Sequence, residues 1–430
     1  MSRPGLSTAT ATRGWSPWRA VVGFGVVSLA ADMVYEGARS VTGPLLASLG
    51  ASAVLVGLVT GAGEAMALVL RLLFGSMADR TGRYWALTLG GYAMTAVCVP
   101  ALAVAPLVGG AGLALACTLI LAERTGKAVR SPAKSALLAH AASAVGFGRG
   151  FAVHKALDEV GAFAGPLLVA GVTALTGTLW PAMAVLVVPG GVAMVLLLWI
   201  RARVGDATSY QPLPVAAGED APASPPDMPL RPEARAPAPP EALPPPAGER
   251  LPRRFWLFAA ASGAATSGLV TFGVISYHLT RDHVVPLAGV PVVYAAAMAA
   301  AAVAALVTGW LYDRWNASVL LALPVLVVAV PPLAFAGTLV PAVAGVLVWG
   351  AAVGVQDSTV KALVAELVPP PRRATAYGMF AAVQGGAAVL GGTMAGALSS
   401  RSVPALVAAV AVTQVVALVL LVATLRRTTA

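Results

Sequence analysis

The sequence predicts an all-α integral membrane protein in which twelve transmembrane helices form two pseudo-symmetric six-helix bundles. The first observation is composition, because hydrophobic residues make up 58% of the 430 residues and charged residues only 11%. The second is a series of long apolar stretches separated by short polar breaks. The third is a repeated motif, Gly-x-x-x-Asp-Arg, which begins at Gly75 and again at Gly309. A repeat at about half the chain length indicates two homologous halves rather than a short-period array.

Apolar stretches long enough to cross a bilayer follow one another through each half. One crossing takes roughly 20 mostly apolar residues as a helix. In the first half, spans are predicted at 20–47, 52–76, 84–104, 111–136, 149–172 and 181–201. In the second half, they are predicted at 254–279, 287–310, 317–338, 341–366, 376–398 and 403–425.

The spans and the segments between them predict four regions. Residues 1–19 are an N-terminal tail, 20–203 the N-terminal bundle, 204–252 a linker and 253–427 the C-terminal bundle. The linker is rich in proline and poor in apolar residues. Such a segment buries too little surface to fold, so we expect it to be disordered.

Arginine placement predicts the orientation in the membrane. Most arginines outside the spans fall in the tail, the linker and alternate loops, whereas the other side receives little beyond Arg281 and Arg401. By the positive-inside rule, both termini and the linker are cytoplasmic and the protein lies in the cell membrane. The two cysteines, Cys98 and Cys117, fall in spans, so we expect neither a disulfide nor a thiolate metal site.

The loop motifs resemble those of the major facilitator superfamily, over essentially the whole chain. Gly75, Asp79, Arg80, Gly82 and Arg83 match its cytoplasmic loop motif, and Gly309, Asp313 and Arg314 form a shorter second copy. In the fifth span, Gly161, Gly165 and Pro166 are similar to the glycine-proline motif of its proton-coupled exporters. The halves also align at Lys134 with Lys361 and at Gly165 with Gly391.

The resemblance implies two bundles around a central cavity lined by the first, fourth, seventh and tenth helices, and transport by alternating access. We interpret the loop and glycine-proline residues as gating elements. Asp79 can accept hydrogen bonds at a neighbouring helix N-terminus, and Arg80 can pair with carboxylates or lipid phosphate. The alternative is plain positive-inside anchoring.

Charged residues inside the spans predict the binding site. A charge at the bilayer centre costs about 2.5–3.5 kcal/mol on insertion scales, so it usually faces a cavity or a partner. The charges are spaced at helical intervals in the first, fourth and tenth spans. The substrate-binding candidates are Asp32, Glu36, Arg39, Arg124, Lys127, Arg130, Tyr277, His278, Asp357 and Lys361. For Glu123 and Lys134, near the ends of their span, a structural salt bridge is the favoured interpretation.

Carboxylates in the spans are also candidates for proton coupling. Burial and neighbouring charges shift carboxylate ionisation, so opening a site to either side can change its protonation. The candidates are Asp32, Glu36, Glu64 and Asp158, with His154 as a relay.

These features together predict a secondary active transporter, not an enzyme. We expect proton-coupled antiport that exports a small polar, anionic or amphipathic solute. Proton-coupled uptake or facilitated diffusion of an organic anion is one alternative, and a receptor that has kept the fold but lost transport is another. The chain has no phosphate-binding loop and no metal motif, so no cofactor is expected. The expected partners are the solute, protons and membrane lipids, without nucleic acid, and the expected oligomeric state is a monomer.

Overall fold

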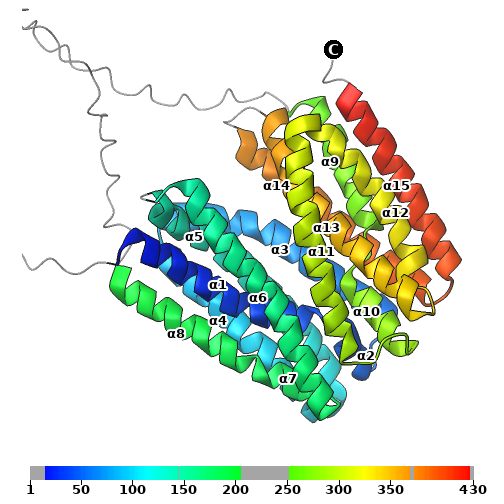
Figure 1. The fold of residues 1–430 in the computed structure, drawn as a ribbon, viewed down its shortest axis with the longest axis horizontal. Helices are drawn as coiled ribbons and strands as arrows, with labels where there is room; N and C mark the ends of the chain where they lie inside the picture. The colour runs from blue at the N-terminus through cyan, green and yellow to red at the C-terminus, as the bar shows by residue number, and fades with distance from the viewer. Residues whose placement is uncertain (1–14, 144, 205–250, 369–371, 427–430) are drawn as a thin grey trace, which may run out of the picture.

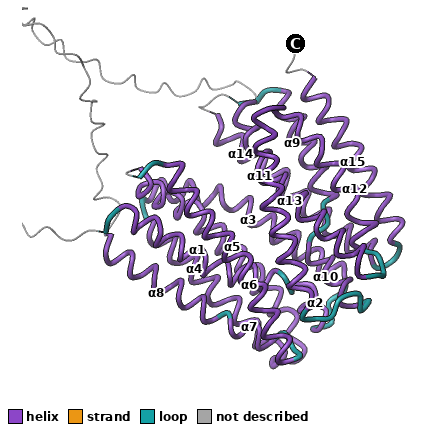
Figure 2. Tube along the Cα trace, viewed as in Figure 1, coloured by secondary structure: helices purple, strands orange, loops and turns teal. Residues whose placement is uncertain are grey.

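The computed structural model describes residues 15–143, 145–204, 251–368 and 372–426, and within these ranges the chain forms helices without a β-strand (Figure 2). Most of the predicted tail 1–19 and nearly all of the predicted linker 204–252 lie outside the described residues. The division into four regions therefore stays a prediction.

The first half of the chain forms six long α-helices and three shorter pieces. They are α1 (Pro17–Arg39), α2 (Thr42–Ser48), α3 (Ala53–Thr81), α4 (Tyr84–Ala101), η1 (Leu102–Ala111), α5 (Gly112–Ser143), α6 (Phe147–Thr176), α7 (Trp180–Val185) and α8 (Val187–Val204). Local sequence explains several boundaries. Ser16 and Ser52 cap the N-termini of α1 and α3, and Gly82 ends α3 in the left-handed conformation at φ 63°.

The second half repeats the pattern. Its elements are α9 (Arg253–Gly268), α10 (Phe272–Arg281), α11 (Gly289–Trp315), η3 (Asn316–Leu321), α12 (Ala322–Ala334), α13 (Leu339–Leu367), α14 (Arg373–Ser399) and α15 (Val403–Arg426).

These helices supply the predicted membrane spans. Eleven segments of the described chain are long and apolar enough to cross a membrane. One of them, Tyr84–Ala142, has 59 residues and contains both α4 and α5, joined by η1. Since a crossing takes roughly 20 residues, this segment crosses twice, which gives twelve spans. The predicted fold class is confirmed.

The first and seventh spans differ from the prediction because each is broken. Helix α1 ends at Arg39 and α2 resumes at Thr42, while α9 ends at Gly268 and α10 begins at Phe272. The second break is supported by Trp349 of α13, whose Nε1 donates to the Val270 carbonyl oxygen at 2.8 Å. Hydropathy does not register a break whose exposed backbone groups are satisfied by a neighbouring helix.

The two bundles converge at one end and diverge at the other (Figure 1). We call the end where α1 begins and α15 ends the termini end, and the opposite end, which carries α2 and α10, the far end. One hydrophobic core at the far end includes residues of both bundles, such as Leu45 and Phe272. At the termini end each bundle has its own core, around Phe24 in one and Phe258 in the other. The fold is therefore closed at the far end.

Backbone contacts at the far end depend on glycine. A Cβ atom on Gly57 of α3 would collide with the carbonyl oxygen of Gly392 in α14. The same holds for Gly43 of α2 against Gly273 of α10. The hydroxyls of Thr60 and Thr271 add a hydrogen bond of 2.8 Å between the bundles. Close helix approach through small residues is the usual way to join helices in a membrane.

We expect Gly57→Leu to destabilise the far-end contact by about 1–3 kcal/mol, because the new side chain overpacks a backbone interface. Differential scanning fluorimetry of the purified protein should show a lower Tm. The matched control is Gly90→Leu in α4, where no atom lies within 4 Å of an added Cβ. Equal Tm values for the two variants would contradict the glycine-dependent contact.

Candidate functional site

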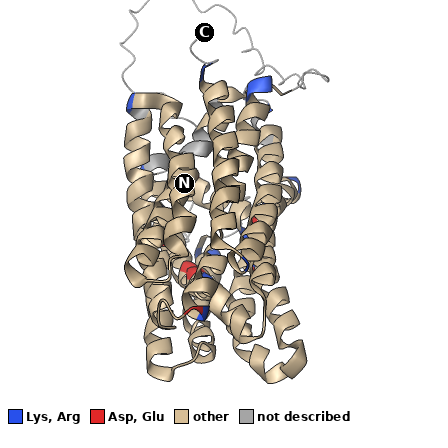
Figure 3. Ribbon diagram, turned by 90° about the vertical axis from the view of Figure 1, so that its right-hand side faces the viewer, with Lys and Arg blue, Asp and Glu red and all other residues tan. Residues whose placement is uncertain are grey.

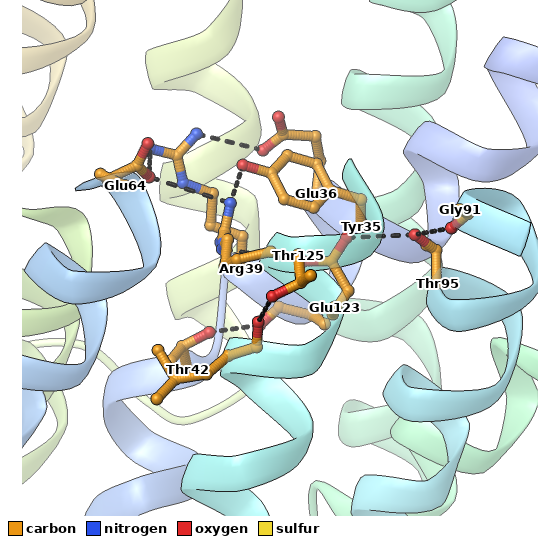
Figure 4. A network of polar contacts seen from close by, with 12 residues as sticks. Tyr35, Glu36, Arg39, Thr42, Glu64, Gly91, Thr95, Glu123 and Thr125 are labelled. Carbon is orange, nitrogen blue, oxygen red and sulfur yellow. Dashed lines mark hydrogen bonds and ion pairs between the residues drawn. The ribbon is translucent and has the colours of Figure 1, made fainter. Parts of the chain in front are cut away.

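Charged side chains predicted in three different spans come together inside the N-terminal bundle (Figure 4). Arg39 at the end of α1 donates from Nη2 to the Glu64 carboxylate of α3 at 2.8 Å. Nη1 of Arg124 in α5 lies 3.9 Å from the same Glu64 oxygen. The Glu64 carboxylate thus pairs with side chains of two neighbouring helices.

Three cations of this cluster surround the ring of Tyr35 in α1. Lys127 Nζ lies 3.5 Å from the ring centroid, and the guanidinium carbons of Arg124 and Arg39 lie at 4.4 and 5.9 Å. Arg124 also donates to the Tyr35 hydroxyl. The negative face of an aromatic ring attracts cations, so Tyr35 offsets part of their mutual repulsion. Tyr35 was not among the predicted site residues, although its i, i+4 spacing to Arg39 places both on one face of α1.

Lys127 makes the fewest polar contacts of the three cations around Tyr35. Within the described residues its ammonium group contacts the Tyr35 ring but has no hydrogen bond or ion pair. An ammonium group carries three N–H donors and no acceptor. Lys127 can therefore offer these donors to an anion without breaking an existing bond.

The cluster keeps some exposed surface. The Glu64 side chain is 33% exposed and that of Arg39 is 23% exposed, whereas Arg124 is nearly buried at 9%. An ionised side chain within a membrane-spanning helix faces water or a partner rather than lipid. We therefore expect the exposed part of Glu64 to face water between the helices. In the side view of Figure 3, acidic segments lie beside basic ones part-way along the helices, and further basic segments lie at helix ends at the top of the view.

Glu123 and Arg130 of α5 form a second, nearly buried group, and it joins the first because Arg124 Nε lies 3.7 Å from the Glu123 carboxylate. Their side chains are 5% and 4% exposed, with Arg130 Nη1 4.0 Å from the Glu123 carboxylate. Thr95 of α4 donates to Glu123 at 3.2 Å and accepts from Arg130. Glu123 thus has the contacts of the structural ion pair that the sequence favoured. Arg130, predicted as a substrate-binding residue, is enclosed with it in this state.

Glu36 links the two bundles. Its carboxylate accepts a 2.5 Å hydrogen bond from the Tyr294 hydroxyl of α11 and lies 3.8 Å from Arg39 Nη1. Tyr294 is fully buried and packs against Phe272 and Trp349, with ring centroids 4.6 and 6.2 Å away. Tyr294 was not predicted, because its partner lies in the other half of the chain. Its burial ties the central charges to the break between α9 and α10.

A pair of carboxyl groups lies one turn before this contact. The carboxyl groups of Asp32 in α1 and Asp158 in α6 lie close enough together to share a hydrogen bond when one of them is protonated. Asp158 also accepts a 3.2 Å hydrogen bond from Lys155, which lies 2.5 Å from Glu159. Lys155 and Glu159 form an i, i+4 ion pair on α6.

His154, predicted as a proton relay, contacts a residue of α1. Its Nε2 lies 3.4 Å from Ser28 Oγ. Ser28 also accepts a 2.8 Å hydrogen bond from Lys134 of α5. The small hydroxyl lets α1 approach α6 closely, so the imidazole reaches across the helices rather than along its own.

The C-terminal bundle contributes less to the described site. Asp357 of α13 is exposed, and it is near Arg71 of α3 in the other bundle. The Nε atom of Arg71 is buried and has no hydrogen-bond partner among the described residues. The side chain of Lys361 lies outside the described residues.

Tyr277 and His278 are not brought to the central cluster. They lie at the far end of α10, where Tyr277 accepts from Arg281 at 2.7 Å. His278 Nδ1 is 2.7 Å from Asp282. That Tyr277 and His278 bind substrate stays a prediction, and such binding would take place away from the central cluster.

The predicted gating residues lie at helix ends and helix crossings. Helix α3 continues through Asp79 and Arg80 to Thr81, so the motif occupies its last turns rather than a loop. Asp79 accepts a 3.2 Å hydrogen bond from Tyr84, and Arg80 and Arg83 are exposed. In the second copy, Gly309, Asp313 and Arg314 belong to α11, with Arg314 4.0 Å from the Trp310 ring centroid. The Asp313 side chain lies outside the described residues.

The glycine-proline motif packs α6 on α1. Added Cβ atoms on Gly161 and Gly165 would collide with the backbone of Leu29 and Met33, and Pro166 follows inside the same helix. In the second half, Gly391 of α14 packs in the same way on the backbone of Ser267 in α9. This repeats the arrangement that the alignment of Gly165 with Gly391 predicts.

The described residues contain no group of three or more His, Cys, Asp or Glu side chains that could hold a metal ion. Cys98 and Cys117 are both free thiols.

Comparison with known proteins identifies the family. The family model described as Major Facilitator Superfamily matches residues 24–392. An uncharacterized protein of Mycobacterium tuberculosis is 50% identical over 418 residues, covering 97% of this chain and 95% of the relative. An uncharacterized protein of Mycobacterium bovis matches equally well.

Solved structures share the fold at low sequence identity. A nucleoside transporter, NupG, is 13% identical with a TM-score of 0.67, covering 95% of this chain and 99% of that chain. A POT family transporter in complex with 5-aminolevulinic acid is 12% identical with a TM-score of 0.68, covering 95% of each chain. A bacterial homologue of the iron transporter ferroportin, in the inward-facing state, is 12% identical with a TM-score of 0.63 and covers 95% of this chain and 98% of that chain. With its twelve spans, two bundles and matching family model, the chain belongs to the Major Facilitator Superfamily and is a multi-pass membrane transporter.

Proposed function

We propose that this transporter is a proton-coupled antiporter that exports a small anionic or amphipathic solute by alternating access. The observation that carries the proposal is the charge of the central cluster. Arg39, Arg124 and Lys127 surround Tyr35. With Arg130 they make four cations against the three carboxylates of Glu36, Glu64 and Glu123. The excess positive charge, with the ammonium group of Lys127 uncommitted, favours an anionic group on the solute.

The Asp32–Asp158 pair supports proton coupling. Two carboxyl groups can hydrogen-bond to each other only when a proton lies between them. The pair joins α1 to α6, the two helices that Gly161 and Gly165 hold together. A change in the number of protons on the pair alters this helix contact, which is the kind of link that coupling requires.

The closed far end supports an inward-facing assignment. The arginine distribution favours a cytoplasmic location for the termini end. The bundles diverge there, with separate hydrophobic cores. On this orientation the solute enters the cluster from the cytoplasm, and the far end must open for release.

Two other functions are distinguishable from antiport. Proton-coupled uptake of an organic anion would use the same cluster, but the solute and the protons would move in the same direction. Facilitated diffusion would also use it, but the solute would move without protons. A non-transporting receptor would keep the charged pairs only as contacts between helices. Proton flux in proteoliposomes separates the three, because antiport alone moves protons against the solute.

The first test uses a solute selected by a thermal-shift screen of small carboxylates, phosphates and zwitterions. Adding it to proteoliposomes that contain the pH dye pyranine should produce proton movement opposite to the solute. We expect Asp158→Asn and Glu64→Gln to abolish this coupled flux, because each removes an ionisable group between α1 and its neighbours. Glu159→Gln is the control, since its carboxylate contacts only the exposed Lys155 among the described residues. Full coupled flux in Asp158→Asn and Glu64→Gln would exclude both from the proton path.

The second test concerns anion recognition. Lys127→Gln should weaken binding of the same solute about tenfold, the effect of losing one charge-assisted hydrogen bond. Isothermal titration calorimetry measures the change in Kd. The matched control, Lys155→Gln, removes a lysine whose side chain is 67% exposed and paired with Asp158 and Glu159. An unchanged Kd in Lys127→Gln would contradict the role assigned to the cluster.

The third test concerns the link between bundles. Tyr294→Phe removes the hydrogen bond to Glu36, and hydrogen bonds to charged groups contribute about 1.5–3 kcal/mol. We expect this variant to populate the state with an open far end more than the wild type does. Labelling of Thr60→Cys by a membrane-impermeant maleimide should become faster in the Tyr294→Phe background. Tyr84→Phe, which removes an exposed hydrogen bond to Asp79, should leave the labelling rate unchanged. Equal labelling rates in all three backgrounds would show that the Tyr294–Glu36 hydrogen bond does not hold the far end closed.

A further inference from the structure

A cavity of about 700 Å³ lies at the far end, between the two bundles. The N-terminal bundle contributes Pro44 to Ser52 and the turn Gly177–Trp180, and the C-terminal bundle contributes Tyr277 to Arg281 and Leu287. Ligand pockets have volumes of roughly 300–1,000 Å³ and are common at domain interfaces. The cavity is separate from the central cluster, because none of the described residues that line it belongs to that cluster.

The wall of this cavity combines apolar surface with one cation. Leu179, Trp180 and Leu287 supply the apolar part, and Arg281 is the only charged side chain that lines it among the described residues. The neighbouring carboxylate, Asp282, is occupied by His278 at 2.7 Å. Arg281 therefore has no carboxylate within ion-pair distance in the described part of the chain.

The guanidinium of Arg281 is positioned by one neighbouring side chain and keeps free N–H donors. Its Nη1 donates to the Tyr277 hydroxyl at 2.7 Å, and its Cζ lies 5.6 Å from the same ring. A guanidinium carries five N–H donors, so further donors are available to a ligand. Arg281 also departs from the arginine distribution of this chain, which favours the termini end. Membrane anchoring by the positive-inside rule does not account for it.

We propose that this cavity binds a water-soluble amphipathic monoanion, with its carboxylate, sulfonate or phosphate-ester group on Arg281 and its apolar body against Trp180 and Leu287. The occupant touches both bundles where the fold is closed. It therefore binds the closed far end better than an open one and stabilises that state. The site is distinct from the proposed transport site, and its test is a binding measurement that does not need transport.

The experiment uses 4-bromobenzoate as the probe, because its bromine quenches tryptophan fluorescence at short range. Full-length protein in nanodiscs of zwitterionic lipid should show saturable quenching, and Trp180→Phe should remove this component. Arg281→Gln should weaken the binding about tenfold, as expected for loss of a charge-assisted contact. Arg401→Gln, which removes another exposed arginine at the far end, should bind like the wild type. The neutral analogue 4-bromobenzamide should not bind.

Two further variants keep the result interpretable. Arg281→Lys preserves the charge and should retain part of the affinity, while Ser48→Phe should block the cavity without touching Arg281. An unchanged affinity in Arg281→Gln, or equal binding of the amide, would overturn the proposal. Competition by phosphatidylglycerol in the nanodisc would also overturn it, since the cavity would then be a lipid headgroup site.

Discussion

The structure depends on one electrostatic constraint, which the Arg39–Glu64 ion pair meets at 2.8 Å. Charges inside an apolar bilayer are costly unless they face a partner or water. Arg39 of α1, Glu64 of α3 and Arg124 of α5 satisfy this requirement by meeting at Tyr35. The charges thereby fix how three helices pack. Lys127 has no ion-pair partner among the described residues, and Glu64 keeps exposed surface. The same cluster can therefore also accept a solute.

Contacts between the bundles concentrate where the charges do not. At the far end, Gly57 and Gly43 meet glycines of the other bundle, and a shared hydrophobic core covers them. Such contacts consist mainly of van der Waals attraction. The free energy lost when they separate is small where other packing contacts form in their place. Two hydrogen bonds add to these contacts: one between the hydroxyls of Thr60 and Thr271, and one from the Tyr294 hydroxyl to Glu36. The second joins the central charges to the closed far end.

The sequence was sufficient for the fold but only partly for the site. Hydropathy and the repeated Gly-x-x-x-Asp-Arg predicted twelve spans in two halves, and helical spacing predicted that Asp32, Glu36 and Arg39 share one face of α1. The partners of these residues were not predictable, because pairs such as Arg39–Glu64 and Glu36–Tyr294 join distant parts of the chain. Periodicity describes one helix at a time. Which helices meet, and which charges become nearly buried like Glu123 with Arg130, follows from packing.

We infer that opening alternates between the two ends of the molecule. The test is the reaction of single cysteines with an impermeant thiol reagent, in a Cys98→Ser, Cys117→Ser background. Thr60→Cys reports the far end, where Thr60 bonds to Thr271, and Ser358→Cys reports the termini end beside the exposed Asp357. Alternating opening predicts opposite changes: any pH or solute condition that speeds reaction at one position slows it at the other. Rates that rise and fall together, or that never respond, would contradict it.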